Sequence, residues 1–317
     1  MKRWPLICVG LFLAFSLFFY SVQERPVHKI RLVWMFDPAG WWEGDWLKEL
    51  LASDQYEIEE VVAPNEKVYL NHALYVTPLF HDRKDLPAFF ESLHRKGYKF
   101  GIVHLSDEHY NHSTKSYRYA KFVLRNCWTK KFAKSPKVLQ FPLGYKTKFW
   151  EGLATKETKP VSERTHLASF AGQITKSTRQ EMAANMKQLG DFFLYETAFF
   201  GDGLPITQYR DLLLDSVFAP CPRGFSNLDT FRLCEALEAG CIPIVEKEPF
   251  DYYACLFDDG YPFLAVHRWD EVGSLLNDAF LADQEGLEQK RQECSLWWKN
   301  QKELFRHKIE NLMWRIR

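Results

Sequence analysis

The chain has 317 residues, and 41 lysine and arginine residues balance 41 aspartate and glutamate residues, so the formal net charge is zero. Hydrophobic residues make up 46% of the chain and aromatic residues 16%, which excludes a disordered protein because this much apolar surface can be buried. The balanced charge argues against a general nucleic-acid binder. A mean hydropathy of -0.33 excludes a polytopic membrane protein, and the length allows two modest domains.

Residues 4–22 form a single uncharged apolar run that follows Lys2 and Arg3. The run is longer than the apolar region of a cleaved signal peptide, which has about 7–15 residues, and no suitable cleavage site follows it. We therefore predict a cytoplasmic tail over residues 1–3, an uncleaved transmembrane signal anchor over 4–22 and a stem over 23–29. The remainder would face the lumen or the exterior; a cleaved signal peptide and a buried core helix are the alternatives.

The first half of the chain alternates between strand and helix patterns, which favours a parallel α/β sheet. Strands are predicted over residues 30–37, 56–63, 72–80, 99–109 and 137–145, and helices over 42–52, 86–97 and 114–133. These elements make up a predicted N-terminal, acceptor-side domain over residues 30–155.

The polar stretch over residues 151–163 is the predicted domain boundary, and the alternation then begins again. Strands are predicted over 166–172, 216–224, 241–246 and 263–267, and helices over 176–189, 207–216 and 229–239. This gives a second α/β domain over residues 164–283. A C-terminal amphipathic segment over 284–317 is predicted to form one long helix or two. Two Rossmann-like halves of this kind bind ligands in the cleft at the carboxyl ends of their strands.

The chain has seven cysteines, of which Cys8 lies in the predicted anchor. The even number that remains allows three disulfides, in keeping with a lumenal location. No cysteine or histidine pattern has zinc spacing, and no Asp-x-Asp motif occurs, so neither a metal nor another cofactor is expected. One acceptor triplet for N-glycosylation starts at Asn111.

The segment over residues 216–246 contains the most informative pattern. A strand leads into the turn Cys221-Pro222-Arg223-Gly224, and polar residues then precede a helix. The free N–H groups and the dipole of a helix N-terminus suit a phosphate, and the guanidinium of Arg223 could bind the same phosphate. Glu235 could accept hydrogen bonds from ribose hydroxyls. The alternative is an ordinary βαβ unit with a capped helix and an Arg232–Glu235 ion pair.

The same segment resembles the nucleotide-sugar-binding half of the exostosin family of glycosyltransferases. The resemblance rests on Cys221-Pro222-Arg223-Gly224, Phe231-Arg232, Glu235-Ala236-Leu237, Ala239-Gly240-Cys241 and Pro243. Residues 166–182 and, more weakly, the segments YRYAKFVLRNCW and VLQFPLGY are also similar to exostosin sequences. The resemblance covers about residues 100–270.

This resemblance implies a GT-B fold, a type II Golgi membrane topology, a donor that is usually a UDP-sugar, and inversion at the anomeric carbon. The residue eight before Glu235 is Asn227 and not the glutamate of many retaining GT-B enzymes, which agrees with inversion. The expected donor-binding residues are Gly172, Arg179, Arg223, Gly224, Ser226, Thr230, Arg232 and Glu235. Arg179 could instead be a solvated helix charge.

An inverting transfer needs a base that takes the proton of the acceptor hydroxyl. Asp107 and Glu108 follow a predicted strand of the first half, where the acceptor should lie, and Asp37 ends the first strand. We rank the candidates in the order Asp107, Glu108, Asp37. Each of them could instead be a loop carboxylate that caps the next helix.

Residues 109–150 contain ten lysine and arginine residues and no acidic residue. This basic stretch is interleaved with aromatic residues and fits an anionic partner such as a diphosphate or an acidic glycan. The alternative is a solvated helix face whose aromatic residues lie in the core.

The sequence thus predicts a membrane-anchored hexosyl- or pentosyltransferase that moves a sugar from a nucleotide-sugar to a glycan acceptor hydroxyl. A non-catalytic glycan-binding or accessory subunit of a glycosyltransferase complex is the first alternative, and an exported hydrolase of another class is the second. The expected partners are the donor, the glycan acceptor and the membrane, with a homo- or hetero-oligomer left open.

Overall fold

The structure is a computed structural model that describes residues 28–317 apart from 65, 78–84, 200, 225 and 258–259. The predicted tail, the predicted anchor and most of the predicted stem lie outside the described residues. Within the described part of the chain, no helix is both long enough and apolar enough to cross a membrane. His28 and Lys29, which the sequence assigns to the stem, belong to the first strand.

The first lobe is built on six parallel strands in the order β2-β1-β3-β4-β5-β6. Their bounds are β1 (His28–Trp34), β2 (Tyr56–Val62), β3 (Ala73–Thr77), β4 (Phe100–His104), β5 (Val123–Arg125) and β6 (Val138–Gln140). Helix α2 (Gly44–Leu51) buries Trp46 and Leu47 against one face of the sheet. Helix α3 (Leu86–Arg95) buries Phe89 and Phe90 in a separate cluster on the other face.

The predicted helix over residues 114–133 is wrong. The structure has instead a short 3-10 turn η1 (Lys115–Arg118), strand β5 and a second turn η2 (Lys130–Phe132). Val123 and Leu124 are fully buried on opposite faces of the sheet between β4 and β6. Burial on both faces of a strand gives a short apolar run without alternation, which periodicity does not distinguish from helix.

The second lobe is built on five parallel strands in the order β11-β10-β9-β7-β8. Their bounds are β7 (His166–Gly172), β8 (Phe192–Glu196), β9 (Ser216–Cys221), β10 (Ile242–Glu246) and β11 (Leu264–Val266). The helices are α4 (Arg179–Met186), α5 (Ile206–Leu214), α6 (Phe231–Glu238), α7 (Tyr252–Leu256), α8 (Val272–Leu275) and α9 (Asp278–Ala282), with 3-10 turns η3 (Val161–Glu163), η4 (Lys187–Leu189) and η5 (Trp269–Glu271).

The two predicted α/β halves are therefore confirmed as two parallel sheets. Strand β8 was not predicted. It lies at the edge of the second sheet, and Phe193 and Tyr195 on it are exposed. Because neither face of this strand is fully buried, its pattern lacks the clear alternation that marks a half-buried strand.

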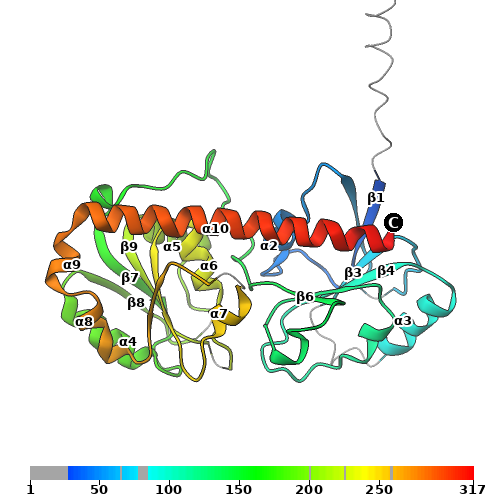
Figure 1. Ribbon diagram of the computed structural model, residues 1–317, viewed down its shortest axis with the longest axis horizontal. Coiled ribbons are helices and arrows are strands. Elements are labelled where there is room, and N and C mark those ends of the chain that lie inside the picture. The colour runs from blue at the N-terminus through cyan, green and yellow to red at the C-terminus, as the bar shows by residue number, and fades with distance from the viewer. Residues whose placement is uncertain (1–27, 65, 78–84, 200, 225, 258–259) are drawn as a thin grey trace, which may run out of the picture.

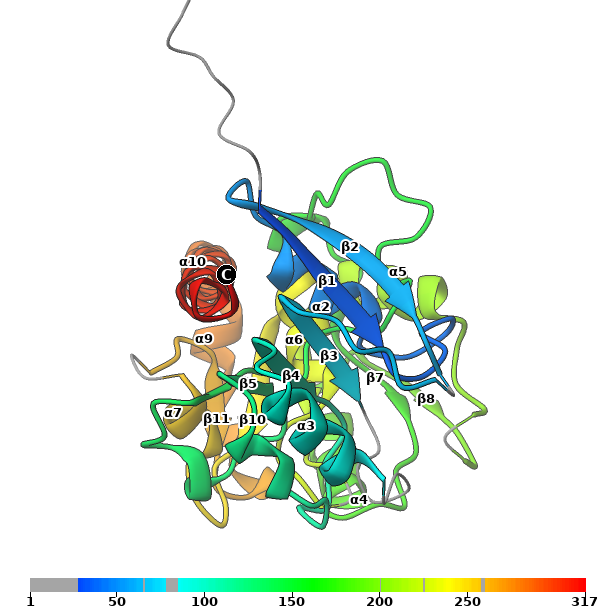
Figure 2. The same ribbon diagram turned by 90° about the vertical axis from the view of Figure 1, so that its right-hand side faces the viewer.

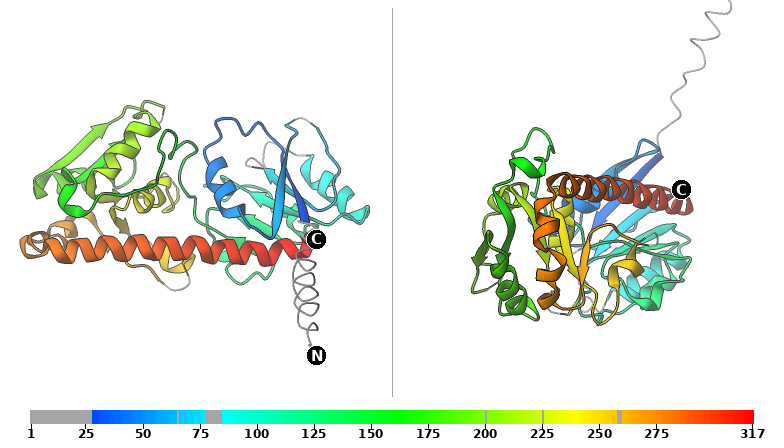
Figure 3. Two further views of the ribbon diagram at one scale, coloured as in Figure 1. Left: turned by 90° about the horizontal axis from the view of Figure 1, so that it is seen from above. Right: turned by 60° about the vertical axis from the view of Figure 1, so that its left-hand side comes forward.

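Helix α10 (Gln284–Met313) runs across both lobes, as Figures 1 and 3 show, and ends in the turn η6 (Trp314–Ile316). The C-terminal segment thus forms one helix and not two. Its buried face is a single stripe made up of Leu287, Cys294, Trp298, Gln301, Phe305, Ile309 and Met313. One core cluster joins residues of both lobes beneath this stripe, so the helix belongs to both lobes.

A compact cluster ties the middle of α10 to each lobe. The indole of Trp298 stacks on that of Trp46 in α2, with ring centroids 5.5 Å apart, and donates to Glu238 in α6 at 2.8 Å. Lys302 Nζ lies 2.9 Å from Glu49 in the first lobe and 2.7 Å from Glu238 in the second. One cation therefore neutralises a carboxylate of each lobe.

The Pro-Leu-Gly-Tyr segment has a packing role in the same cluster. Trp46 donates from its indole nitrogen to the carbonyl of Pro142 at 3.0 Å. Gly144 has a φ of +82°, and a Cβ atom there would lie 2.1 Å from the Trp46 ring. Only glycine meets both demands.

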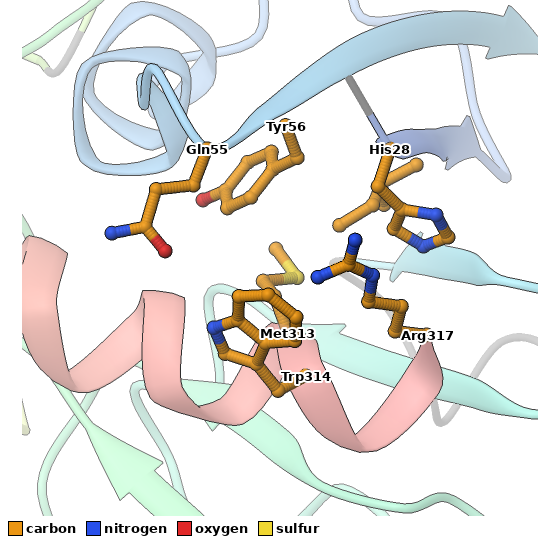
Figure 4. Close-up of a pocket in the computed structure, with 7 residues that line it drawn as sticks. His28, Gln55, Tyr56, Met313, Trp314 and Arg317 are labelled. Atoms are coloured by element: carbon orange, nitrogen blue, oxygen red, sulfur yellow. The ribbon is translucent and has the colours of Figure 1, made fainter. Parts of the chain in front are cut away.

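The far end of α10 packs beside the start of the first sheet (Figures 2 and 4). His28, Gln55, Tyr56, Met313, Trp314 and Arg317 surround a small cavity there. Its volume of about 10 Å³ leaves room for about one water molecule. This cavity is a packing gap and not a ligand site.

The six cysteines of the described chain are free thiols, and five of them are buried. Cys8 lies outside the described residues. The three disulfides that the even cysteine count allowed are thus absent from the described structure, where the buried thiols take the place of small apolar side chains.

We predict that replacing Lys302 with methionine lowers the free energy of unfolding at pH 7 by about 3–5 kcal/mol, because the buried Glu238 and the half-buried Glu49 lose their shared cation. Lys299→Met is the matched control, because Lys299 is exposed on the same helix. Chemical denaturation measures both variants, and equal losses in the two would contradict the assignment.

The loss of stability in Lys302→Met should depend on pH. Burial alone would raise the pKa of Glu49, but Lys302, Tyr145 and Lys156 together lower it from 4.5 to about 2. Stability from a lowered pKa is present above the unfolded value and is lost as the pH falls through the folded value. The difference between the wild type and Lys302→Met should therefore shrink between pH 4.5 and pH 2.

Candidate functional site

A cavity of about 400 Å³ lies between the two lobes. The loops that follow β4, β5, β6, β7, β8 and β9 all contribute to its lining. Parallel α/β sheets bind ligands at the carboxyl ends of their strands, and this cavity is placed there in both lobes at once. Its polar lining includes Glu43, Ser106, Glu108, Lys146, Gln173, Lys176, Arg179, Thr197, Asp229, Thr230, Arg232 and Glu235.

The second lobe supplies a cationic wall. The guanidinium groups of Arg232 and Arg179 lie 4.2 Å and 5.9 Å from the centroid of the same Phe170 ring. Arg232 donates to the carbonyl of Ala171 at 2.6 Å, and its Nε is buried without a hydrogen-bond partner among the described residues. Burial, followed by the neighbouring Arg232, lowers the pKa of Arg179 to about 10.

Within the part of the chain that the structure describes, neither Arg179 nor Arg232 forms an ion pair with a carboxylate. Lys176 lies beside Arg179, and burial and then Arg179 lower the pKa of this lysine. Three neighbouring cations that repel one another are the electrostatic signature of a site for a multiply charged anion.

Two glycines allow close approach to this wall. Gly172 has a φ of +148°, and a Cβ atom there would lie 3.0 Å from Nη2 of Arg232. A Cβ atom on Gly224 would lie 3.1 Å from a carboxylate oxygen of Glu108 in the other lobe. Both glycines line the cavity, so side chains at these positions would fill space that the site uses.

Glu235 lies in α6 near Arg232. It is almost completely buried and accepts a hydrogen bond from the backbone N–H of Lys146 at 3.2 Å. Burial raises the pKa of Glu235, although Arg232 and Lys146 act in the opposite direction. The carboxyl is therefore positioned from both lobes.

Three carboxyl groups gather at another part of the cavity. Glu43 and Glu108 come from the first lobe and Asp229 from the second, and all three line the cavity. All three act on Cys127, which also lines the cavity. Burial raises the pKa of the Cys127 thiol well above its ordinary value, and the charges of Asp229, Glu43 and Glu108 raise it further. The lining of the cavity therefore has an acidic wall, made up of Glu43, Glu108 and Asp229, in addition to its cationic wall.

Asp229 is the most perturbed of these carboxyl groups. Its Oδ2 accepts from the backbone N–H of Leu143 at 3.0 Å and from the hydroxyl of Tyr252 at 3.4 Å. Its Oδ1 is buried and has no hydrogen-bond partner among the described residues. Burial raises the pKa of Asp229 to about 7, and the charge of Glu108 contributes to the increase.

Glu43 is held from its own lobe. Its Oε1 accepts hydrogen bonds from the Ser106 hydroxyl at 2.7 Å and from the Asn126 amide at 2.9 Å. Burial raises the pKa of Glu43, and these hydrogen bonds lower it in part.

The structure separates the three predicted bases. Glu108 lines the cavity, whereas Asp107 and Asp37 do not. Asp107 is buried beneath the loop, where its Oδ2 accepts from Arg125 at 3.0 Å and its Oδ1 from the backbone N–H of His112 at 3.2 Å. Asp37 is exposed and accepts from the backbone N–H of Ala39 at 2.9 Å. Asp107 and Asp37 thus bind groups within the first lobe, and neither of them caps the helix that follows.

Six of the eight predicted donor-binding residues line the cavity, and Arg223 and Ser226 do not. Arg223 is paired with Glu246, with Nε 2.7 Å from Oε2, and its carbonyl accepts from Nε of Arg179 at 3.2 Å. The Ser226 hydroxyl lies 2.7 Å from Nδ1 of His109 and bridges the lobes. In this structure Arg223 holds Arg179 in place.

Among the residues that the structure describes, His104, Asp107 and His112 form a group of the kind that can ligate a metal. Both ring nitrogens of His104 are already engaged, one 2.9 Å from His112 and the other 2.5 Å from the Tyr117 hydroxyl. Arg125 supplies the positive charge at Asp107. The three residues therefore belong to a buried hydrogen-bond network under the loop that carries Glu108. They do not fit a metal ion, because their ligand atoms are already bonded to one another, to Tyr117 or to Arg125.

Sequence reasoning did not name Glu43, Lys146, Lys176 or Asp229 as site residues, although all four line the cavity. Glu43 lies in an aromatic segment, WWEGDW, where two carboxylates among three tryptophans were the available signal. Asp229 lies in the segment that carries the family resemblance, but its carboxylate accepts from the backbone of Leu143 in the other lobe, a contact that no local pattern reveals.

The comparisons with known proteins agree with this architecture. The sequence profile of the Exostosin GT47 domain matches residues 93–271, and no curated protein sequence matches the chain. Among solved structures, an α1,3-fucosyltransferase is 13% identical and covers 92% of each chain with a TM-score of 0.49.

A second solved structure is a DNA-modifying β-glucosyltransferase, studied with and without its substrate uridine diphosphoglucose. It is 13% identical, covers 90% of this chain and 99% of its own, and has a TM-score of 0.52. This similarity shows the fold, so the predicted GT-B architecture of two facing α/β lobes is confirmed. Because the matched residues span more than half of the chain, it belongs to the exostosin GT47 family of glycosyltransferases.

Proposed function

We propose that this protein is a glycosyltransferase that moves a hexosyl or pentosyl group from a UDP-sugar to a glycan acceptor hydroxyl, with inversion. The observation that carries the proposal is the pair Arg179 and Arg232, which share Phe170, line the cavity and have no carboxylate partner in the described chain. A diphosphate supplies the missing negative charge, and guanidinium groups bind phosphate oxygens through paired donors.

The nucleoside half of the donor fits beside the same wall. Glu235 offers a buried acceptor for ribose hydroxyls, and the hydroxyl of Thr230 is buried without a partner among the described residues. The substrate of the solved β-glucosyltransferase, uridine diphosphoglucose, supports a uridine nucleotide here. Gly172 and Gly224 leave room for the diphosphate.

For the chemistry we propose Glu108 as the base. The acceptor hydroxyl oxygen attacks the anomeric carbon from the face opposite the diphosphate, and the bond from that carbon to the phosphate oxygen breaks. The electron pair of that bond leaves with UDP, and the hydroxyl proton passes to the Glu108 carboxylate. Arg179, Arg232 and Lys176 stabilise the charge that develops on the leaving group. No metal or other cofactor is part of this proposal.

We also propose that residues 4–22 anchor the protein in the Golgi membrane of a eukaryotic host with the two lobes in the lumen, or in an exporting membrane otherwise. The acceptor in this proposal approaches from the first lobe, where the basic stretch exposes Lys115, Arg118, Lys121, Lys130, Lys131 and Lys134. This exposed charge favours an acceptor glycan that carries acidic groups.

Arg232→Ala and Arg179→Ala should each weaken UDP binding roughly ten- to hundredfold, because each variant removes a charge-assisted contact to the diphosphate. Isothermal titration calorimetry with UDP measures the effect. Arg118→Ala is the matched control, because Arg118 is exposed in the basic stretch outside the cavity. Unchanged affinity in both cavity variants would refute the donor site.

Glu108→Gln separates an enzyme from a non-catalytic accessory subunit. It should lower the rate of sugar transfer or of UDP-sugar hydrolysis by about 10²- to 10⁴-fold, because the proton acceptor is lost. The affinity for UDP should stay within about twofold of the wild type, and EDTA should leave the wild-type rate unchanged. Donor binding without turnover by the wild type would favour the accessory subunit.

Asp229→Asn should remove a pH dependence of the free energy of unfolding. Because burial raises the folded-state pKa of Asp229 from 3.8 to about 7, the stability of the protonated form is lost as the pH rises through 7. The wild type should therefore lose roughly 2–4 kcal/mol relative to Asp229→Asn between pH 5 and pH 8. Urea denaturation across this range measures the difference, and parallel curves would contradict it.

A further inference from the structure

We propose that the sugar transferred at this site is uncharged and that the cavity rejects a donor that carries a uronic acid. This inference rests on the proposed donor site and adds the chemical class of the sugar. The structural basis is the charge distribution of the cavity, in which Glu43, Glu108 and Asp229 form one wall and Lys176, Arg179 and Arg232 another.

The covalent structure of the donor determines which wall the sugar meets. The sugar is bonded directly to the second phosphate, so it lies within one ring of the cations that hold the diphosphate. Glu108 connects the two walls, because its charge acts on Lys176 and Arg179 as well as on Asp229, and its Oε1 would lie 3.1 Å from a Cβ atom on Gly224 in the second lobe. A ring next to the diphosphate therefore lies against the acidic wall.

The acidic wall needs hydrogen-bond donors. Oδ1 of Asp229 belongs to a side chain that is 4% exposed, and this oxygen has no partner among the described residues. A sugar hydroxyl can donate to it and relieve the cost of an unpaired buried acceptor. A uronate carboxylate has no proton to donate, and its negative charge would be added beside Glu43 and Asp229, which are buried, and Glu108, which is half-buried.

The remaining cations of the cavity belong to the nucleotide and not to the sugar. Lys146 acts on the buried Glu235, and Lys176 lies beside Arg179. Arg125 is buried and paired with Asp107 at 3.0 Å outside the lining. Each of these three cations thus has a neighbour other than the sugar: Glu235, Arg179 or Asp107.

The test compares matched donors that differ only at the sixth carbon. Isothermal titration calorimetry on the full chain at pH 8, where Asp229 is ionised, gives the affinities of UDP-glucose against UDP-glucuronate and of UDP-galactose against UDP-galacturonate. Each uronate should bind at least about tenfold more weakly than its neutral partner. UDP alone, measured in the same way, reports the donor site itself.

Two variants assign the effect to the wall. Asp229→Asn and Glu43→Gln should each reduce the ratio of the neutral-donor affinity to the uronate-donor affinity to about threefold or less. The affinity of both variants for UDP should stay within about twofold of the wild type. Glu157→Gln, which changes an exposed carboxylate outside the cavity, should leave the ratio unchanged.

The outcomes separate the two proposals. If UDP binds but uronates bind as tightly as their neutral partners, the inference about the sugar is wrong and the donor site stands. The inference would also be wrong if both wall variants kept the wild-type ratio of neutral-donor to uronate-donor affinity, because residues other than Asp229 and Glu43 would then reject the uronate. If UDP fails to bind, the proposed function itself is wrong.

Discussion

The placement of Lys302 between Glu49 and Glu238 is the interaction on which the rest of the structure depends. Two lobes with separate sheets have no reason to keep one orientation unless something buried spans them, and α10 supplies that span (Figure 3). A buried ion cluster gains little over an apolar one, but breaking it is costly. The cluster therefore favours a single arrangement of the lobes, and the stacked Trp46 and Trp298 rings reinforce it.

The burial and the pKa values of the carboxyl groups in the cavity depend on that arrangement of the lobes. Backbone N–H groups of Leu143 and Lys146 in the first lobe bind Asp229 and Glu235 in the second. These contacts bury both carboxyl groups, and burial raises their pKa values. The titration behaviour of the site is therefore a consequence of how the lobes meet and not of either lobe alone.

The net charge of the chain is zero, but positive and negative residues are separated both along the sequence and within the cavity. Along the sequence, an acid-free stretch lies beside an acidic remainder, and this is visible by counting residues. In the cavity, the segregation is tertiary: Glu43 and Asp229 are 186 positions apart, yet both act on Cys127. The sequence identified the basic stretch, whereas only folding assembles the acidic wall.

The sequence by itself determined the two α/β halves, the family and most of the cationic wall, because strand patterns and the turn before α6 are local features. It did not determine which candidate base reaches the cavity: Asp107 and Glu108 are adjacent, and only the tertiary contacts turn Asp107 toward Arg125 and leave Glu108 in the lining. It also mistook β5 for helix, because burial on both faces removes the alternation of a strand. Periodicity records which faces of an element are buried, but the partner of a given carboxylate depends on which distant segments the fold brings beside it.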